Sequence, residues 1–243
     1  MRIFAIGDLH LAGGTGKTMD RFGDHWINHD QKIFGSWKQK VDPDDLVIIA
    51  GDTTWAMRLD QALPDLRRIG EMPGLKILIK GNHDYWWQTL SKLRSALPES
   101  IRPLHAGFTI VNRIAVAGTR GWLCPNDSHF GDDDRKIYDR EVGRLRSALS
   151  LVDERRGEFD CLIVALHYPP TSQTHESTGF TELIEQYRAD ICVYGHLHGD
   201  DISTALSGIH RGVMYYLVSA DAAGFEPVEI TVSNYNQGIA ENS

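Results

Sequence analysis

Acidic, amide and imidazole side chains follow five short apolar runs of the sequence, close to the point where each run ends. The runs are RIFAI, LVIIA, LKILIK, CLIVAL and ICVY. The residues that follow them are Asp8, His10, Asp52, Asn82, His83, Asp84, His167, His196 and His198. The set offers oxygen and nitrogen donors and no thiolate, which suits Mn²⁺, iron or Zn²⁺ in a catalytic site better than a closed thiolate site.

The donors are numerous enough to hold two metal ions. Hydrolytic two-metal sites keep their ions about 3.5–4 Å apart, and Asp52 is the natural carboxylate to bridge such a pair. Each motif alone also fits an ordinary role: a lone G-D fits a turn, N-H-D fits a helix cap, and His167 fits a packed histidine. Because residues of this kind follow five separate apolar runs in one chain, a metal site is favoured over these ordinary roles.

The apolar runs have the length and β-branched composition of buried strands. They span residues 2–6, 46–50, 75–79, 114–117, 161–166 and 191–194. Helical spacing of apolar residues lies between some of them, at Leu59, Leu63, Leu66 and Ile69 and at Ile137, Val142, Leu145 and Leu149. Strands and helices therefore alternate, which predicts an α/β fold. Residues 212–219 and 227–232 predict further strands without an intervening helix, as a second sheet or an antiparallel edge.

The order of these elements determines where the donors lie. In α/β sheets, ligands bind beyond the carboxyl ends of the strands. Side chains that follow five strands are therefore expected to meet at one rim, although they are spread over nearly the whole chain. Glycines precede four of the donor groups and suit tight turns with a close approach of the backbone.

The composition is that of a globular protein. The chain has 243 residues, of which 42% are hydrophobic and 24% are charged, with a formal net charge of -8. We predict one domain over residues 1–243, with a polar tail from about residue 234. The negative net charge argues against general binding of nucleic-acid backbones, because proteins bind these backbones mainly by neutralising their phosphates with positive side chains.

Targeting and redox signals indicate a cytoplasmic protein. The first apolar run meets Asp8 too soon for a signal peptide, and no apolar stretch approaches the ~20 residues of a membrane span. The three cysteines, Cys124, Cys161 and Cys192, form no C-x-x-C pair and are expected to be reduced core residues.

The five groups resemble the motif blocks of the calcineurin-like metallophosphoesterases, D-x-H, G-D, G-N-H-[DE], H and G-H-x-H, in that order. Here they are Asp8-Leu9-His10, Gly51-Asp52, Gly81-Asn82-His83-Asp84, His167 and Gly195-His196-Leu197-His198. The continuations GDTTWAMRL and KGNHDYWW further resemble a bacterial branch of predicted phosphohydrolases. The resemblance implies a four-layer α/β/β/α sandwich, in which two mixed sheets are flanked by helices.

The resemblance also implies a role for each donor. One ion would be held by Asp8, His10, Asp52 and His198, and the other by Asp52, Asn82, His167 and His196. The implied reaction is hydrolysis of a phosphomonoester or phosphodiester by in-line attack of a metal-bridging hydroxide. His83 would face the substrate and protonate the leaving oxygen or hydrogen-bond the transition state. Asp84 would hold the ring of His83 and raise its pKa.

Several residues near these motifs are candidates for binding the substrate. Trp55 and Trp122 could form a wall for a base or sugar, and Arg58 and Arg120 could grip a phosphoryl oxygen or a distal phosphate. Core packing and surface charge are the alternatives. Trp86 and Trp87 are expected to open a helix and pack on the sheet. Residues 124–135 are expected to form a long polar loop, either a lid or a solvated excursion.

Three other functions compete with this hypothesis. A nuclease or nucleotide phosphodiesterase would use the same donors, and a non-catalytic scaffold could keep the fold alone. A phosphate-binding loop at GGTGKT fails because Leu11 stands where the motif G-x-x-x-x-G-K-[ST] requires its first glycine. The expected partner is a small or nucleotide-type phosphate ester, with no nucleic-acid backbone and no membrane.

Overall fold

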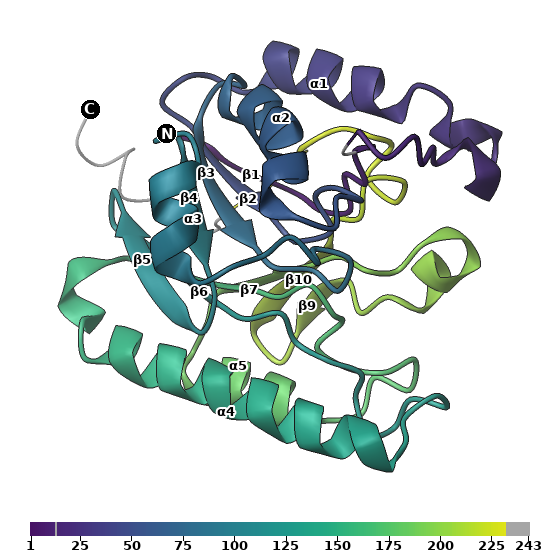
Figure 1. Cartoon of the computed structure of the whole chain (residues 1–243). Helices are drawn as coiled ribbons and strands as arrows, with labels where there is room; N and C mark the ends of the chain where they lie inside the picture. The colour runs from purple at the N-terminus through teal and green to yellow at the C-terminus, as the bar shows by residue number, and fades with distance from the viewer. Residues whose placement is uncertain (13, 232–243) are drawn as a thin grey trace.

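Two β-sheets stack face to face between two layers of helices in the computed structural model, which describes residues 1–12 and 14–231 (Figure 1). The first sheet has the order β11 (Val228–Glu229), β1 (Ile3–Ile6), β2 (Leu46–Ile49), β3 (Leu75–Ile79) and β4 (Ile101–Leu104). The second has the order β5 (Gly107–Val111), β6 (Ile114–Gly118), β7 (Cys161–Ala165), β8 (Ile191–Tyr194), β10 (Val213–Leu217) and β9 (Gly208–His210).

Both sheets are mixed, as expected. Strands β1 to β4 are parallel to one another, and β11 joins the edge of β1 in the antiparallel sense. Strands β6, β7, β8 and β10 are likewise parallel, while β5 and β9 are antiparallel to their neighbours. The carboxyl ends of β1, β2 and β3 therefore lie at one edge of the first sheet, and those of β7 and β8 at one edge of the second.

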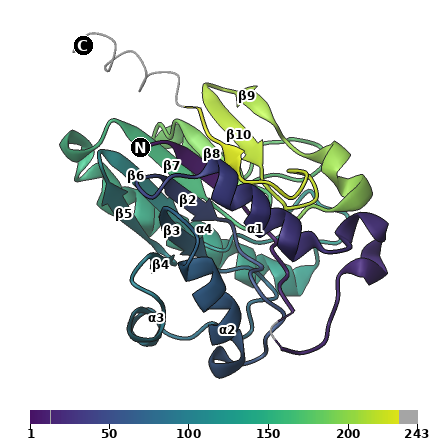
Figure 2. The ribbon, with the colours of Figure 1, turned by 90° about the horizontal axis from the view of Figure 1, so that it is seen from above.

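The helices form the two outer layers. Helices α1 (His29–Lys40), α2 (Leu59–Gly70) and α3 (Leu90–Ala96) cover the first sheet (Figures 1 and 2). Helices α4 (Asp132–Asp153) and α5 (Gly179–Gln186) cover the second. The described residues also form four short 3-10 helices: η1 (Asp20–Phe22), η2 (Asp24–Trp26), η3 (Arg156–Glu158) and η4 (Gly199–Thr204). The four-layer prediction is confirmed.

The strand sequences are apolar throughout because alternate side chains enter two different cores. In β2, Leu46 and Ile48 belong to the core between the sheets, whereas Val47 and Ile49 belong to the core under the helices. Successive side chains point to opposite faces of a strand, and both faces are buried here. The pattern fixes the register of the strands and hence the positions of the residues that follow them.

The structure corrects two expectations about loops. Helix α4 begins at Asp132, so the three consecutive aspartates form its first turn, where carboxylates favour the positive end of the helix dipole. The loop is therefore shorter than residues 124–135. Helix α3 begins at Leu90 with Thr89 as its N-cap, so Trp86 and Trp87 do not open it. Trp86 is nevertheless fully buried, as the packing expectation required.

The expected polar tail from about residue 234 lies outside the described residues. The strand predicted over 227–232 is shorter than expected, because β11 ends at Glu229; residue 232 lies outside the described residues. In the part of the chain that the structure describes, none of the helices combines the length and the apolar character needed to cross a bilayer.

Candidate metal centre

Five loops that follow parallel strands bring the donor residues to one rim between the two sheets. The loop after β1 carries Asp8 and His10, and the loop after β2 carries Asp52. Asp8, His10, Asp52 and His196 adopt left-handed backbone conformations, with φ of 56°, 42°, 49° and 75°. Residues with side chains rarely adopt positive φ, and such strain concentrates at functional sites, where the surrounding structure over-determines it.

Glycines allow the backbone to pass close to the two buried carboxylates. A Cβ atom on Gly81 would lie 2.1 Å from Oδ1 of Asp52, and one on Gly195 would lie 2.2 Å from Oδ2 of Asp8. Both distances are far below van der Waals contact, so a larger residue would displace the carboxylate. The glycines of the G-N-H-D and G-H-L-H motifs are therefore required by packing at this rim.

One group of donors surrounds Asp8. Its Oδ1 atom lies 3.4 Å from Nε2 of His198 and 4.0 Å from Nε2 of His10. The same His10 nitrogen lies 3.8 Å from Oδ2 of Asp52. Ligand atoms of Asp8, His10 and His198 all lie within 4.8 Å of one another, which is the spacing of atoms that share one cation.

A second group surrounds the other side of Asp52. Nε2 of His167 lies 3.6 Å from Oδ2 of Asp52 and 2.6 Å from Oδ1 of Asn82. Nδ1 of His196 lies 3.0 Å from the same Asn82 oxygen. Oδ2 of Asp52 is therefore close to donors of both groups, as a bridging ligand would be.

The electrostatics of the rim favour added positive charge. Burial, together with the charges of Asp8 and Asp84, raises the pKa of Asp52 well above its usual value. Oδ1 of Asp8 is buried and accepts no hydrogen bond. Within the described residues, neither carboxylate forms an ion pair with Lys or Arg. Buried carboxylates without a cation are costly, so the donor set fits bound metal.

Hydrogen bonds to groups outside the donor set orient two of the imidazoles. Nδ1 of His167 lies 2.9 Å from the carbonyl oxygen of Ala50, and Nδ1 of His198 lies 2.8 Å from Oδ1 of Asp221. A ring that donates its Nδ1–H to such an oxygen presents the lone pair of Nε2 to the centre. Burial lowers the pKa of His198, but the neighbouring carboxylates of Asp221 and Asp8 raise it to about 10.

Asp221 is a residue that the sequence analysis missed. It lies in the turns after β10, in the segment Ser219-Ala220-Asp221, with no motif around it. The backbone N–H of Gly199 also donates to its Oδ2 atom, at 3.1 Å. Asp221 thus fixes both the ring of His198 and the chain that follows it, a role that appears only when two distant loops are placed together.

Asp84 has a different role from the one expected. Its carboxylate accepts hydrogen bonds from the backbone N–H groups of Asp52 (3.1 Å), Thr53 (2.9 Å) and Gly81 (2.8 Å), and from Nε1 of Trp86 (3.0 Å). These donors occupy the buried carboxylate, so it fixes the loop that carries Asp52 and does not hold the ring of His83. The expected rise in the pKa of His83 is also wrong, because burial lowers that pKa.

His83 lies at the open side of the centre. Its backbone N–H donates to Oδ1 of Asp52 at 2.8 Å, and its Nε2 atom lies 3.9 Å from Oδ2 of Asp52. The side chain is 35% exposed, close to the 32% of His198, whereas Asp8 and Asp52 are buried. Trp55 stacks on His10 with a ring distance of 4.7 Å and lies 4.6 Å from His83. Trp55 therefore forms a wall of this opening.

The other candidate substrate residues divide into two sets. Arg120 and Trp122 lie beside the second donor group: the carbonyl oxygen of Arg120 accepts from the backbone N–H of His167 at 3.0 Å, and its guanidinium lies 4.4 Å from the ring of Trp122. Arg58 lies at the start of α2, is 73% exposed and forms an ion pair with Asp60 at 3.1 Å. Its partner is thus a surface carboxylate of α2.

Comparison with known proteins identifies the class. The family model for calcineurin-like phosphoesterases matches residues 1–200 of the chain. The chain therefore belongs to the calcineurin-like phosphoesterase family, which together with the Asp and His groups supports a metal-dependent phosphohydrolase. No curated protein matches the chain in sequence.

Solved structures show the same fold at low sequence identity. Phosphopantetheinyl hydrolase (PptH) from Mycobacterium tuberculosis superimposes with a TM-score of 0.57 and 16% identity, covering 96% of each chain. The protein of unknown function AQ665 from Aquifex aeolicus gives a TM-score of 0.51 and 13% identity, covering 100% of this chain and 99% of that one. The protein TT1561 of Thermus thermophilus gives a TM-score of 0.52 and 13% identity, covering 81% of this chain and 82% of that one.

Proposed function

We propose that this protein is a dinuclear metal-dependent phosphoesterase that hydrolyses small phosphate esters. The observation that carries the proposal is the buried pair Asp8 and Asp52, which lacks a Lys or Arg partner in the described chain and is bordered by imidazoles on two sides. Membership of the calcineurin-like phosphoesterase family supports the reaction class.

The contacts support a division of the donors between two ions. Asp8, His10 and His198 would hold the first ion and Asn82, His167 and His196 the second, with Asp52 shared between them. Mn²⁺, iron and Zn²⁺ all suit this mixture of carboxylate, amide and imidazole donors. When bound, the ions would supply Lewis-acid chemistry, lowering the pKa of a water molecule and neutralising charge on the phosphoryl oxygens.

Residues of the chain would orient the substrate around this centre. His83 is a half-buried imidazole at the opening and would donate a hydrogen bond or a proton to the leaving oxygen. Trp55 packs against both His83 and His10, which restricts their motion and excludes water from one side. Asp84 would act as a positioning residue, since it fixes the backbone at Asp52.

The test is hydrolysis by metal-stripped protein of p-nitrophenyl phosphate and bis-p-nitrophenyl phosphate. Mn²⁺, Fe²⁺, Zn²⁺ and Mg²⁺ are added separately, and Asp52→Asn is compared with Asp60→Asn, the same change at an exposed site. We expect metal-dependent turnover that Asp52→Asn abolishes and Asp60→Asn retains. No turnover by protein that holds two ions would contradict the proposal and favour a non-catalytic scaffold.

A replacement of His83 tests its part in the reaction. Because proton donation matters most for a poor leaving group, His83→Ala should slow hydrolysis of an alkyl phosphate more than hydrolysis of p-nitrophenyl phosphate. Equal loss with both esters would argue against proton donation by this ring.

A further inference from the structure

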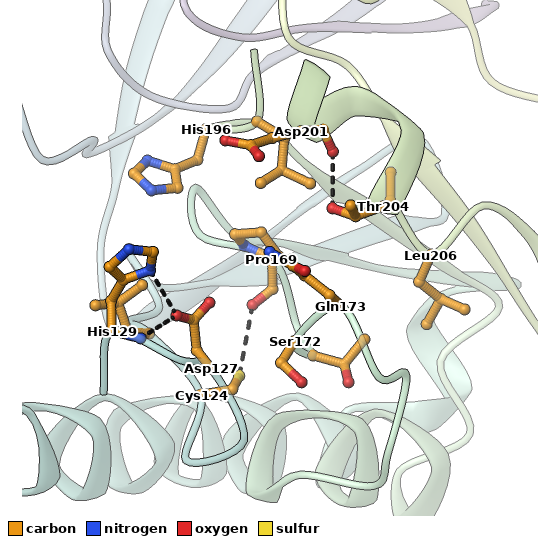
Figure 3. Close-up of a pocket in the computed structure, with 14 residues that line it drawn as sticks. Cys124, Asp127, His129, Pro169, Ser172, Gln173, His196, Asp201, Thr204 and Leu206 are labelled. Carbon is orange, nitrogen blue, oxygen red and sulfur yellow. Dashed lines mark hydrogen bonds and ion pairs between the residues drawn. The ribbon is translucent and has the colours of Figure 1, made fainter. Parts of the chain in front are cut away.

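A small cavity adjoins the second donor group of the metal centre. Three segments line it: the loop after β6, the loop after β7, and η4 with the residues beside it (Figure 3). His196 lies at one end, and its Nδ1 atom is 3.0 Å from the oxygen of Asn82. The cavity, which we call the His196 pocket, therefore opens beside the atoms expected to bind the phosphoryl group.

The volume of the His196 pocket limits its occupant. It measures about 160 Å³. A cavity of about 150 Å³ holds a benzene-sized molecule, whereas pockets for drug-sized ligands measure about 300–1,000 Å³. A group of about six non-hydrogen atoms fits this volume, but a nucleoside does not.

The charge of the lining limits the occupant further. The titratable side chains of the lining are Asp127, Asp201, His129, His196 and Cys124, with no Lys or Arg among the lining residues. Burial raises the pKa of the Cys124 thiol to about 12, so this thiol is neutral. A phosphate or carboxylate in the pocket would face two carboxylates without a permanent cation, which opposes its binding.

Polar groups are available for hydrogen bonds with a ligand. The carboxylate of Asp201 and the amide of Gln173 form no hydrogen bond within the described residues. Thr204 donates its hydroxyl proton to the carbonyl oxygen of Asp201 at 2.8 Å, which leaves its oxygen free to accept. Pro169 and Leu206 supply apolar surface. This lining suits hydroxyl or ammonium groups on a short carbon skeleton.

We propose that the His196 pocket binds the alcohol part of the phosphate ester, and that this alcohol is small, carries hydroxyl or amino groups and has no negative charge. The inference rests on the proposed hydrolase function. It selects esters of small polyols and amino alcohols over esters that carry a second phosphate or a carboxylate.

Kinetics on matched esters test the selection. Glycerol 2-phosphate and O-phosphoethanolamine are compared with 3-phosphoglycerate, with Mn²⁺-loaded protein. We expect kcat/KM to be at least about tenfold higher for the first two esters, because like charges placed together oppose binding. Asp201→Asn should lower the ratio of kcat/KM for O-phosphoethanolamine to kcat/KM for 3-phosphoglycerate several-fold. Asp200→Asn, an exposed neighbour outside the lining, should leave the ratio unchanged.

A binding measurement separates the pocket from catalysis. In saturation-transfer NMR on the full chain in chelating buffer, ethanolamine and glycerol should receive saturation, whereas glycolate, the anionic match of ethanolamine, should not. Ala205→Trp, which fills the lining at a half-buried position, should abolish both signals. A thermal unfolding curve shows whether this variant is folded, and Gln173→Trp at an exposed lining position is the second filling variant.

The two proposals fail in different ways. Two results would overturn the pocket inference while p-nitrophenyl phosphate is still hydrolysed and the hydrolase proposal stands. One is that 3-phosphoglycerate reacts as well as glycerol 2-phosphate, and the other is that glycolate binds as well as ethanolamine. If no ester is hydrolysed with any metal while ethanolamine still binds and Ala205→Trp removes it, the hydrolase proposal fails and the pocket keeps its ligand class.

Discussion

The two ends of strand β2 carry aspartates in opposite circumstances. Asp45 precedes the strand and accepts hydrogen bonds from the backbone of Arg2 (2.6 Å), the guanidinium of Arg2 (2.8 Å) and the backbone of Asp42 (2.9 Å). Burial raises its pKa, but these hydrogen bonds lower it below the usual value. Asp52 follows the strand, and burial with the charges of Asp8 and Asp84 raises its pKa instead.

The difference separates a structural carboxylate from a functional one. Both side chains are nearly inaccessible, at 4% and 2% exposure. Burial therefore does not distinguish them, and the partners do. At Asp45 the chain supplies a permanent cation, Arg2, whereas at Asp52 the neighbouring loops add two further carboxylates, Asp8 and Asp84, and a set of imidazoles. No Lys or Arg of the described chain pairs with the carboxylates at the Asp52 end, which is the physical basis for proposing metal there.

Asp52→Asn should have the largest effect. We expect turnover to fall by at least about 10²–10³-fold, the loss that follows removal of one charge-stabilising group at a reaction centre. The same change removes a buried charge, so the metal-free variant should unfold at a higher temperature than metal-free wild type. Activity assays and thermal unfolding with and without chelator measure the two effects, and a lower unfolding temperature for the variant would contradict this account of the charge.

Asp84→Ala should have the second largest effect, which is a loss of folding stability. The change leaves four buried donors without their acceptor, which should lower the free energy of unfolding by about 3–5 kcal/mol. Asp84→Asn keeps one oxygen and should cost less. Chemical denaturation of the metal-free proteins provides the comparison, and equal stability of Asp84→Ala and wild type would disprove the positioning role.

Asp221→Asn should weaken metal binding more moderately. Loss of a carboxylate that orients a ligating imidazole typically reduces metal affinity or activity about 10–100-fold. Because Asp221 contacts Nδ1 of His198, the weakened affinity should belong to one ion of the pair, which a stepwise Mn²⁺ titration would resolve. Asp200→Asn, a change at an exposed position of η4, serves as the control and should bind metal as wild type does.

Asp45→Asn should have the smallest effect, and it should depend on pH. The folded pKa of Asp45 is lowered, so its stabilisation is fully present above the unfolded pKa and is lost as pH falls through the folded value. The free energy of unfolding of the variant should therefore be about 1–2 kcal/mol below that of wild type at pH 7, a modest loss because Arg2 is itself partly exposed. This difference between variant and wild type should shrink below about pH 4. A difference that grew on acidification would show that Asp45 is not the charged partner of Arg2.

Local sequence signals predicted the frame of the site well. The bounds of β3 and β8 agree with the predicted strands, and the five motifs follow the strands as expected. Buried parallel strands are short apolar runs because both faces are covered, so their ends are visible in the sequence. The loops after those ends then bring Asp8, Asp52 and His167 within 4.8 Å of one another.

Features that depend on contacts between distant loops were not visible in the sequence. Asp221 has no motif because its partner, His198, lies on another loop. The role of Asp84 was misassigned because adjacency in sequence suggested His83, whereas the turn directs the carboxylate to three backbone amides. The polar composition of 124–135 indicated a loop, but its aspartates serve as the first turn of α4.

The central claim is that the rim holds two metal ions that share Asp52. An equilibrium titration of metal-free protein with Mn²⁺, read by electron paramagnetic resonance of the free ion, tests it most directly. The account predicts two ions bound per chain in wild type and in Asp45→Asn, and fewer than two in Asp52→Asn. If wild type bound no ion, or if Asp52→Asn bound as many as wild type with the same affinity, the claim would be wrong.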